Sequence, residues 1–229
     1  MELEITNFDY YICVLDFEAT CENNTTWENE IIEFPSVLYG WNFKEKKLTY
    51  KGEFREYCQP QLNPKLTFFC TDLTKITQET VDKGSKFPDT FVRHYKWLIS
   101  LIGEKNVSEK TVILTCGAWD INQMLPKELK HWNIFEFPQI YYKWLNVKIV
   151  FETVKGLKAG GMPMMLKELD LILEGTHHSG LDDCKNISKI LIKLVEMGYQ
   201  FNEGDIKTKD YKKYFNTKKN VVDLKLDWK

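Results

Sequence analysis

Two acidic residues, Asp16 and Glu18, follow an apolar run near the start of the chain. That run, residues 10–15 (YYICVL), has the content of Tyr, Ile and Val that is typical of a buried β-strand. Side chains alternate across a strand, so both acids point to the same face. Ionised carboxylates at the end of a buried strand are costly unless they are paired or bind cations. The pair is therefore either a strand end that reaches solvent or a site for hard divalent cations, which take oxygen ligands.

A third acid, Asp120, follows a second short apolar run. This run, residues 111–115 (TVILT), predicts another buried strand, and residues 121–130 after it are amphipathic. Taken alone, Asp120 is explained as the start of a helix beside Trp119. Its position after a core strand nevertheless matches that of the first two acids.

A histidine and a fourth acid lie at the start of the clearest helix in the sequence, predicted over residues 181–197. Asp183 lies in the first turn of this helix, where the helix dipole favours a negative charge. His178 stands five residues earlier, in a loop that ends in Gly180. Singly, these residues are a dipole-complementing acid and a loop histidine. Together with the three other acids their spacing is restrictive, and we interpret the set as one site.

The elements that must position these residues alternate between strands and helices. Beyond those already named, the sequence predicts a hairpin of two strands (31–42 and 47–57), short helices around 66–70 and 78–83, a helix over 87–101, a possible edge strand at 137–142, a helix capped by Asn146 that reaches about residue 154, and a helix over 164–173. This order favours one α/β domain with a mixed central sheet and helices on both faces. We place it at residues 8–202, and we expect residues 203–229, a lysine-rich tail, to be flexible or loosely docked.

The composition of the chain limits the classes of protein that fit. With 229 residues, 43% hydrophobic and 28% charged, it fits one large globular domain with or without an appendage. The net charge of −2 gives no overall signature of nucleic-acid binding, so any basic surface must be local. No apolar run approaches the roughly 18 residues of a membrane span. The six cysteines form no C-x-x-C pair, and we expect them to be reduced, in a cytoplasmic or nuclear protein.

Four separated motifs together resemble the DEDDh 3′→5′ exonuclease superfamily, which has a ribonuclease-H-like fold and the pattern D-x-E, a later D, and H-x4-D. The closer resemblance is to its Eri-type family, the histone-mRNA 3′-end exonucleases. The matching stretches are residues 15–22 (LDFEATCE), 66–81 (LTFFCTDLTKITQETV), 116–120 (CGAWD) and 178–186 (HSGLDDCKN). His177 with Asp182 also satisfies H-x4-D, but the family pattern selects His178 with Asp183. The resemblance covers roughly residues 11–199.

The resemblance implies a metal-dependent exonuclease. Asp16, Glu18, Asp120 and Asp183 would hold two Mg²⁺ ions, for which Mn²⁺ could substitute, with Asp16 bridging both. His178 would act as the general base that deprotonates the attacking water. The products would be nucleoside 5′-monophosphates. The expected nucleotide pocket comprises Phe17, Ala19, Thr20, Leu73, Thr74, Ile76 and Trp119, together with His178.

The expected partners are RNA 3′ ends, either single-stranded or on a stem-loop with a 3′ overhang, with single-stranded DNA as a further candidate and no membrane. Since fifteen residues precede Asp16, we expect no additional N-terminal nucleic-acid-binding domain. Three alternatives remain open at this point: a DNA-directed exonuclease, a catalytically silent nucleic-acid-binding module on the same fold, and a glycosidase that uses an acid pair. The last needs neither the histidine nor Mg²⁺.

Overall fold

A mixed β-sheet forms the centre of the computed structural model, which describes residues 8–23, 26–211, 215 and 223–228. The strands described are β1 (Tyr10–Leu15), β2 (Glu18–Ala19), β3 (Ile31–Asn42), β4 (Lys47–Tyr57), β5 (Thr111–Thr115), β6 (Lys143–Asn146) and β7 (Lys207–Thr208). The strand order is β2-β3-β1-β5-β6-β7, with β4 paired to β3. β1, β5 and β6 run parallel, whereas β3 and β4 form the predicted antiparallel hairpin.

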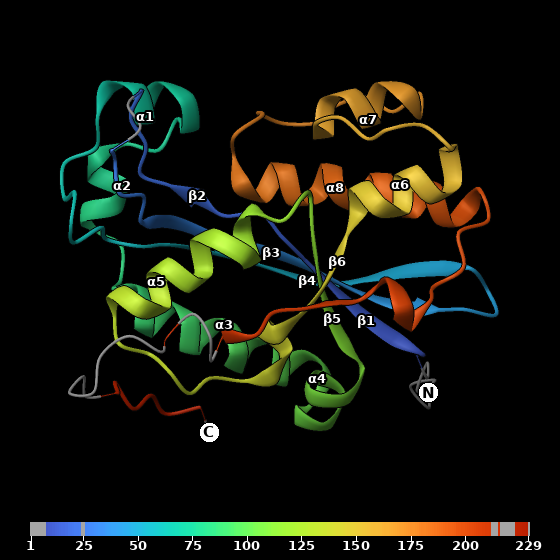
Figure 1. Cartoon of the computed structure of the whole chain (residues 1–229), viewed down its shortest axis with the longest axis horizontal. Helices are drawn as coiled ribbons and strands as arrows, with labels where there is room; N and C mark the ends of the chain where they lie inside the picture. The colour runs from blue at the N-terminus through green and yellow to red at the C-terminus, as the bar shows by residue number, and fades with distance from the viewer. Residues whose placement is uncertain (1–7, 24–25, 212–214, 216–222, 229) are drawn as a thin grey trace, which may run out of the picture.

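Helices cover both faces of this sheet, as the sequence predicts (Figure 1). They are α1 (Phe68–Thr74), α2 (Gln78–Asp82), α3 (Phe87–Ile102), α4 (Glu104–Lys110), the π-helical turn η1 (Asp120–Met124), α5 (Leu125–His131), the 3₁₀ turn η2 (Gln139–Tyr142), α6 (Val147–Lys155), α7 (Met162–Glu168), α8 (Gly180–Glu196) and the 3₁₀ turn η3 (Glu203–Asp205). Side chains alternate along β1 between two hydrophobic cores. Cys13 and Leu15 face α3, η1 and α5, while Ile12 and Val14 face α6, α7 and α8.

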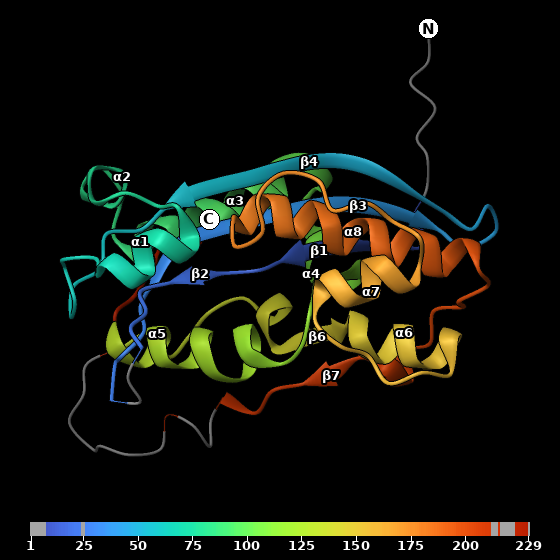
Figure 2. The ribbon, with the colours of Figure 1, turned by 90° about the horizontal axis from the view of Figure 1, so that it is seen from above.

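The two short helices α1 and α2 lie beside the end of β2 (Figures 1 and 2). Each begins at a threonine whose hydroxyl accepts a backbone N–H three residues on: Thr67 from Cys70, and Thr77 from Thr80. Such side-chain caps compensate for the small number of internal hydrogen bonds in helices of this length. The caps hold α1 in a position in which its last turn reaches the end of the central strands.

Three local predictions need correction, and one helix was not predicted. Residues 137–142 are not an edge strand: residues 139–142 form η2, and the strand β6 begins at Lys143, between β5 and β7. The side chains of Ile140 and Tyr141 are buried in the core, which accounts for the strand-like composition of that segment. The helix predicted over 164–173 is α7, which begins at Met162 and ends at Glu168. The helix predicted around 66–70 begins and ends later, as α1, and α4 was not predicted.

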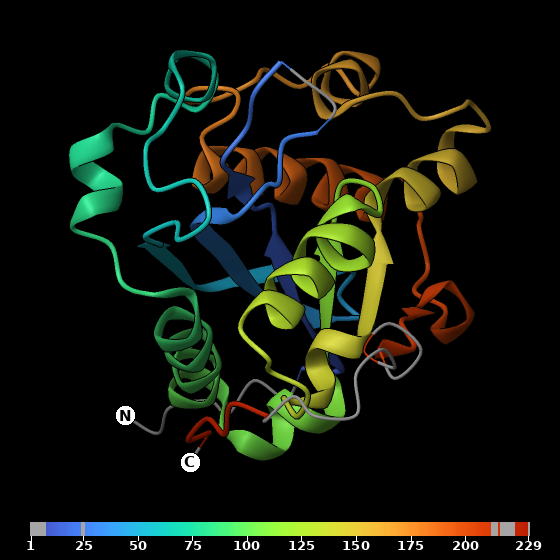
Figure 3. The same cartoon turned by 60° about the vertical axis from the view of Figure 1, so that its left-hand side comes forward.

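The described part of the tail is docked, so the expectation of a flexible or loosely docked segment is wrong there. β7 pairs with β6, and the buried Tyr211 donates its hydroxyl hydrogen bond to the backbone carbonyls of Ile121 and Tyr141. The indole of Trp228 packs edge-on against Phe91 of α3, with ring centroids 5.2 Å apart. Figures 1 and 3 show the C-terminus on the α3 side of the molecule. Residues 212–214, 216–222 and 229 of the predicted tail lie outside the described residues.

In the described ranges, none of the helices combines the length and the apolar character needed to cross a membrane.

Candidate active site

Three of the predicted acids meet where β1 and β2 approach the start of α8. Asp16 directly follows β1, Glu18 begins β2, and Asp183 lies in the first turn of α8. One carboxylate oxygen from each lies within 4.8 Å of those of the other two. The three acids line a cavity of about 400 Å³, in which Glu18 and Asp183 are buried and Asp16 is partly buried. The period of two in the D-x-E motif thus places both acids at one site.

Asp120 joins the same cavity from β5. The chain leaves β5 through residues 116–119 and turns into η1, of which Asp120 is the first residue. The buried Asp120 carboxylate accepts a hydrogen bond from the backbone N–H of Phe17, at 3.0 Å. This bond fixes the third motif against the peptide between Asp16 and Glu18. All four predicted acids therefore line one cavity.

Glu33 holds the start of α8 in place, a role that the sequence did not reveal. Its buried carboxylate accepts the backbone N–H groups of Gly180 and Leu181, each at 3.3 Å, and pairs with the guanidinium of Arg55 at 2.8 Å. Glu33 lies opposite Glu18 in the β2–β3 pairing. An acid inside the apolar run 31–38 (IIEFPSVL) was the available signal, because an ionised group there needs partners.

Gly180 is required by space at this junction. A Cβ atom on Gly180 would lie 2.7 Å from the carbonyl oxygen of Asp16 and 2.7 Å from Cγ of Pro35. Glycine therefore lets the first turn of α8 approach β1 and β3 closely enough to bring Asp183 beside Asp16.

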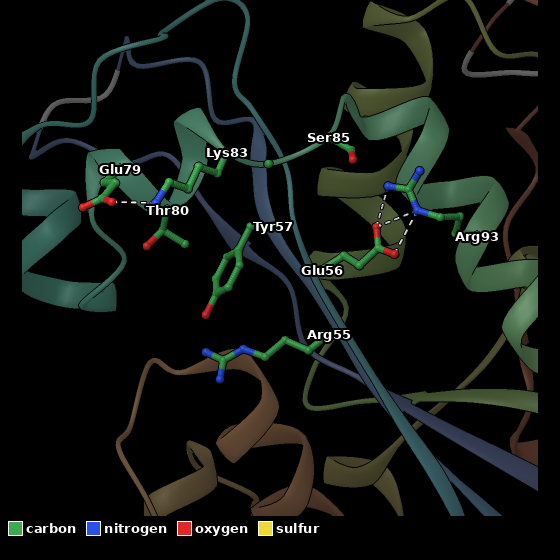
Figure 4. Close-up of a pocket in the computed structure, with 9 residues that line it drawn as sticks. Arg55, Glu56, Tyr57, Glu79, Thr80, Lys83, Ser85 and Arg93 are labelled. Carbon is green, nitrogen blue, oxygen red and sulfur yellow. Dashed lines mark hydrogen bonds and ion pairs between the residues drawn. The ribbon is translucent and has the colours of Figure 1, made fainter.

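Arg55 also lines a second cavity, of about 730 Å³, on the β4 side of the molecule (Figure 4). The cations of that cavity have acidic partners: Arg93 forms a forked ion pair with Glu56, and Lys83 pairs with Glu79. These pairs neutralise much of its positive charge. We therefore assign the chemistry to the cavity that contains the four carboxylates.

The carboxylates raise one another's pKa. Burial raises the pKa of Asp16 well above its ordinary value, and the charges of Asp120 and Asp183 add to the effect. Burial, and then the charge of Glu33, raise the pKa of Glu18 to about 9, while burial raises that of Asp120 to about 6. A cluster of this kind is relieved by cations, and a donor set made entirely of carboxylate oxygens fits Mg²⁺ or Mn²⁺. The residues present therefore fit divalent metal ions.

Both histidines of the loop before α8 reach the site. The backbone N–H of His178 donates to Asp183 at 2.9 Å, and Nδ1 of His177 lies 3.2 Å from each oxygen of the same carboxylate. The two imidazoles stack with centroids 3.9 Å apart, and both line the cavity. His178 adopts a left-handed backbone conformation with φ of 66°. Burial and the neighbouring His177 lower the pKa of His178, so its imidazole is neutral at pH 7. The choice between the two registers remains a prediction.

The cavity wall contains most of the predicted nucleotide pocket. Phe17, Ala19, Leu73, Thr74, Trp119 and His178 line it. Thr20 and Ile76 do not: the buried hydroxyl of Thr20 accepts the backbone N–H of Glu30, and Ile76 is buried in a small cluster with Cys70 and Val81. Sequence reasoning missed Asn29, Lys148 and residues 161–163, which also line the cavity and lie in no motif.

The fold and the site together define the ribonuclease-H-like exonuclease class. The family model described as "Exonuclease" matches residues 13–191, and the chain belongs to this family, in its DEDDh branch of Eri type. Among curated relatives, it is 36% identical to 3′-5′ exoribonuclease 1 of Mus musculus over 82% of this chain and 54% of the relative. It is 34% identical to ERI1 exoribonuclease 3 of Homo sapiens over 85% of this chain and 56% of the relative. The chain thus spans about half the length of these relatives.

A solved structure shows the same similarity. The nuclease domain of 3′hExo, described as a DEDDh family member bound to rAMP, superposes with a TM-score of 0.74 at 32% identity. The match covers 84% of this chain and 94% of that domain. The ribonuclease-H-like fold predicted from the sequence is confirmed.

Proposed function

We propose that the chain is a metal-dependent 3′→5′ exoribonuclease that releases nucleoside 5′-monophosphates from RNA. The observation that carries this proposal is the convergence of the Asp16, Glu18 and Asp183 carboxylates, within 4.8 Å of one another, in a cavity that also contains Asp120 and His178. The similarity to exoribonucleases and to a nuclease domain bound to rAMP supports RNA as the polymer.

The four acids serve to hold two divalent cations, Mg²⁺ in the first place and Mn²⁺ as a substitute. When bound, such ions neutralise phosphodiester charge and clamp the attacking and leaving oxygens. Asp16, Glu18, Asp120 and Asp183 are the residues that would hold them. The hydrogen bond that the Phe17 N–H donates to Asp120, and those that the N–H groups at the start of α8 donate to Glu33, keep these acids oriented.

His178 serves as the general base. Its lowered pKa leaves the imidazole neutral, which is the form that can accept a proton from the attacking water. The loop that carries it is tied to Asp183 through its own backbone N–H. The base is thereby held next to the acids.

The wall formed by α1 and Trp119 receives the terminal nucleoside. Leu73 and Thr74 come from the last turn of α1, and Ala19 from β2. Trp119 is 38% exposed, so its indole is available for stacking on a base, a contact that tolerates any sequence. RNA 3′ ends, single-stranded or on a stem-loop with an overhang, are the substrates that such a site accepts. The six cysteines, all described in the structure, form no disulfide there, which suits the reducing cytoplasm or nucleus, where we place the enzyme.

Matched oligonucleotides test the proposal. RNA and DNA of the same sequence, single-stranded and hairpin, are incubated with Mg²⁺, with Mn²⁺ or with a chelator. We expect stepwise shortening of RNA from its 3′ end with either metal and none with the chelator. Faster degradation of DNA would make the protein a DNA exonuclease. Binding without cleavage under every condition would make it a silent binding module.

A further inference from the structure

Two cysteine side chains meet at the rim of the cavity. Cys21, two residues beyond β2, is partly buried and lines the cavity, whereas Cys70 is buried in the first turn of α1. The side chain of Cys21 packs against the small buried cluster that contains Cys70, and each thiol shifts the pKa of the other. The sequence separates them by 49 positions, so the contact arises from the fold.

The backbone around the two thiols joins the same two segments. The hydroxyl of Thr67 donates to the carbonyl of Cys21 at 2.8 Å and accepts the N–H of Cys70 at 2.9 Å. The Cys70 thiol also lies 3.7 Å from the carbonyl oxygen of Ala19. The end of β2 and the first turn of α1 are therefore held together at this point. Each segment also contributes to the nucleotide wall, β2 through Ala19 and α1 through Leu73 and Thr74.

We propose that Cys21 and Cys70 are an oxidisable thiol pair, and that their reversible disulfide lowers the activity of the neighbouring site. The functional part of this inference rests on the proposed exonuclease activity. A disulfide needs sulfur atoms about 2.05 Å apart, closer than two thiols that are in contact but not bonded. Forming it draws α1 toward the end of β2 and displaces the wall that receives the nucleoside.

Hydrogen peroxide is a sufficient oxidant. One sulfur of the pair attacks a peroxide oxygen and becomes a sulfenic acid, while the other oxygen leaves as water. The second sulfur then displaces the hydroxyl group of the sulfenic acid, which leaves as a second water, and the S–S bond forms. Two thiols have lost two electrons and two protons, and the peroxide has gained both.

The surroundings favour this pair over the other cysteines. The hydrogen bond from Cys21 lowers the pKa of Cys70 to about 7, so the pair supplies a thiolate near neutral pH. By contrast, burial raises the pKa of Cys116 to about 12, although that thiol lines the same cavity. Cys116 is therefore the matched control for a cysteine that is close to the site but poorly reactive.

The test combines peptide mapping with activity. The full chain and its Cys21→Ser, Cys70→Ser and Cys116→Ser variants are treated with hydrogen peroxide and then divided. One half is alkylated and mapped by mass spectrometry, and the other is assayed on RNA before and after addition of a thiol reductant. We expect a Cys21–Cys70 linked peptide in the full chain and in Cys116→Ser. In both proteins activity should fall by about tenfold or more and return with reductant. Both pair variants should keep the activity that they had before oxidation.

Each of the other outcomes contradicts one stated part of the proposal. If the linked peptide is absent from the oxidised full chain, Cys21 and Cys70 are not an oxidisable thiol pair. Formation of the peptide without loss of activity overturns its effect on the site. If Cys70→Ser does not fold, the partly exposed Cys21→Ser alone decides the comparison. Failure of the reduced protein to cleave RNA contradicts the proposed function instead, because the peptide map does not depend on cleavage.

Discussion

At the scale of single residues, the site is a set of like charges held close by the fold. Asp16 has its pKa raised by burial and by the charges of four further acids, so its ionised form is unfavourable without a counter-charge. These acids are Asp120, Asp183, Glu18 and Glu33. Such a cluster does not by itself stabilise the fold, because a buried charge without a partner costs free energy. Binding of divalent cations offsets the cost, which links the arrangement directly to metal-dependent chemistry.

The two adjacent histidines are distinguished by a pair of single variants. His178→Ala should lower turnover by about 10²–10⁴-fold, the usual contribution of a general base. His177→Ala removes the contact of its ring with Asp183 and its stacking on His178, and should change turnover by less than about tenfold, or about 1.4 kcal/mol of barrier. Both variants are assayed side by side at saturating Mg²⁺ and pH 7.5. The reverse ranking would transfer the role of base to His177, and two small effects would remove histidine from the mechanism.

At the scale of elements, the close contact between α8 and the strands brings the last acid to the site. Gly180→Ala places a methyl group against the backbone of Asp16 and against Pro35, so the start of α8 must shift. We expect stability to fall by about 1–3 kcal/mol and kcat/KM by about 100-fold. Chemical denaturation and RNA cleavage measure the two effects.

Gly156→Ala is the matched control for this variant. Gly156 has φ of 65° at the end of α6 and no atom within 4 Å of an added Cβ. It should lose about 1–2 kcal/mol of stability through backbone strain and keep its activity. Full activity in Gly180→Ala would show that the close approach is not needed.

The sequence predicted elements well where local pattern decides the structure. The acids at strand ends follow from a period of two, and the long helix α8 follows from apolar spacing. The close packing of Gly180 was not predicted, because its contact with Asp16 joins segments far apart in the chain. Likewise, β6 has four residues, too few to show alternation, so the aromatic segment before it was mistaken for the strand. Glu33 was missed since its partners come from β4 and α8.

At the scale of the whole molecule, aromatic residues of the tail complete the core on the α3 side. We propose a boundary of the exonuclease domain at residue 202, although later residues contribute to its stability. Tyr211 is 1% exposed, so Tyr211→Ala should cost about 3 kcal/mol or more in the free energy of unfolding. Tyr211→Phe loses only the hydroxyl hydrogen bonds and should cost about 1 kcal/mol. Urea unfolding of both variants gives the comparison. A cost below 1 kcal/mol for the alanine variant would show that the tail contributes little.

The buried His94 connects the strands with the helical layer and should make stability depend on pH. Its ring nitrogens contact the hydroxyls of Ser36, at 2.8 Å, and Tyr141, at 2.7 Å. Burial lowers its pKa to about 3, below the value of about 6.5 for an unfolded chain. The unfolded state therefore binds one more proton between these pH values. Stability is fully present above pH 6.5 and falls as pH decreases, by up to about 1.4 kcal/mol per pH unit.

The test for His94 compares how steeply the free energy of unfolding changes with pH in the wild-type protein and in a variant. His94→Gln cannot take up that proton, so its stability should fall less steeply between pH 6.5 and pH 4.5. Urea unfolding at several pH values measures both slopes, and the remaining titrating groups are common to the two proteins. Equal slopes would contradict a buried neutral His94.

Digestion of one RNA strand with a free and with a blocked 3′ end tests the central claim most directly. The wild-type protein and Asp16→Asn, which keeps the shape of the side chain and removes its charge, are compared with Mg²⁺ and with a chelator. We predict nucleoside 5′-monophosphates only from wild type, Mg²⁺ and the free 3′ end, with circular dichroism showing that the variant is folded. Near-full activity of folded Asp16→Asn, or cleavage of the blocked strand, would contradict a metal-dependent 3′→5′ exonuclease.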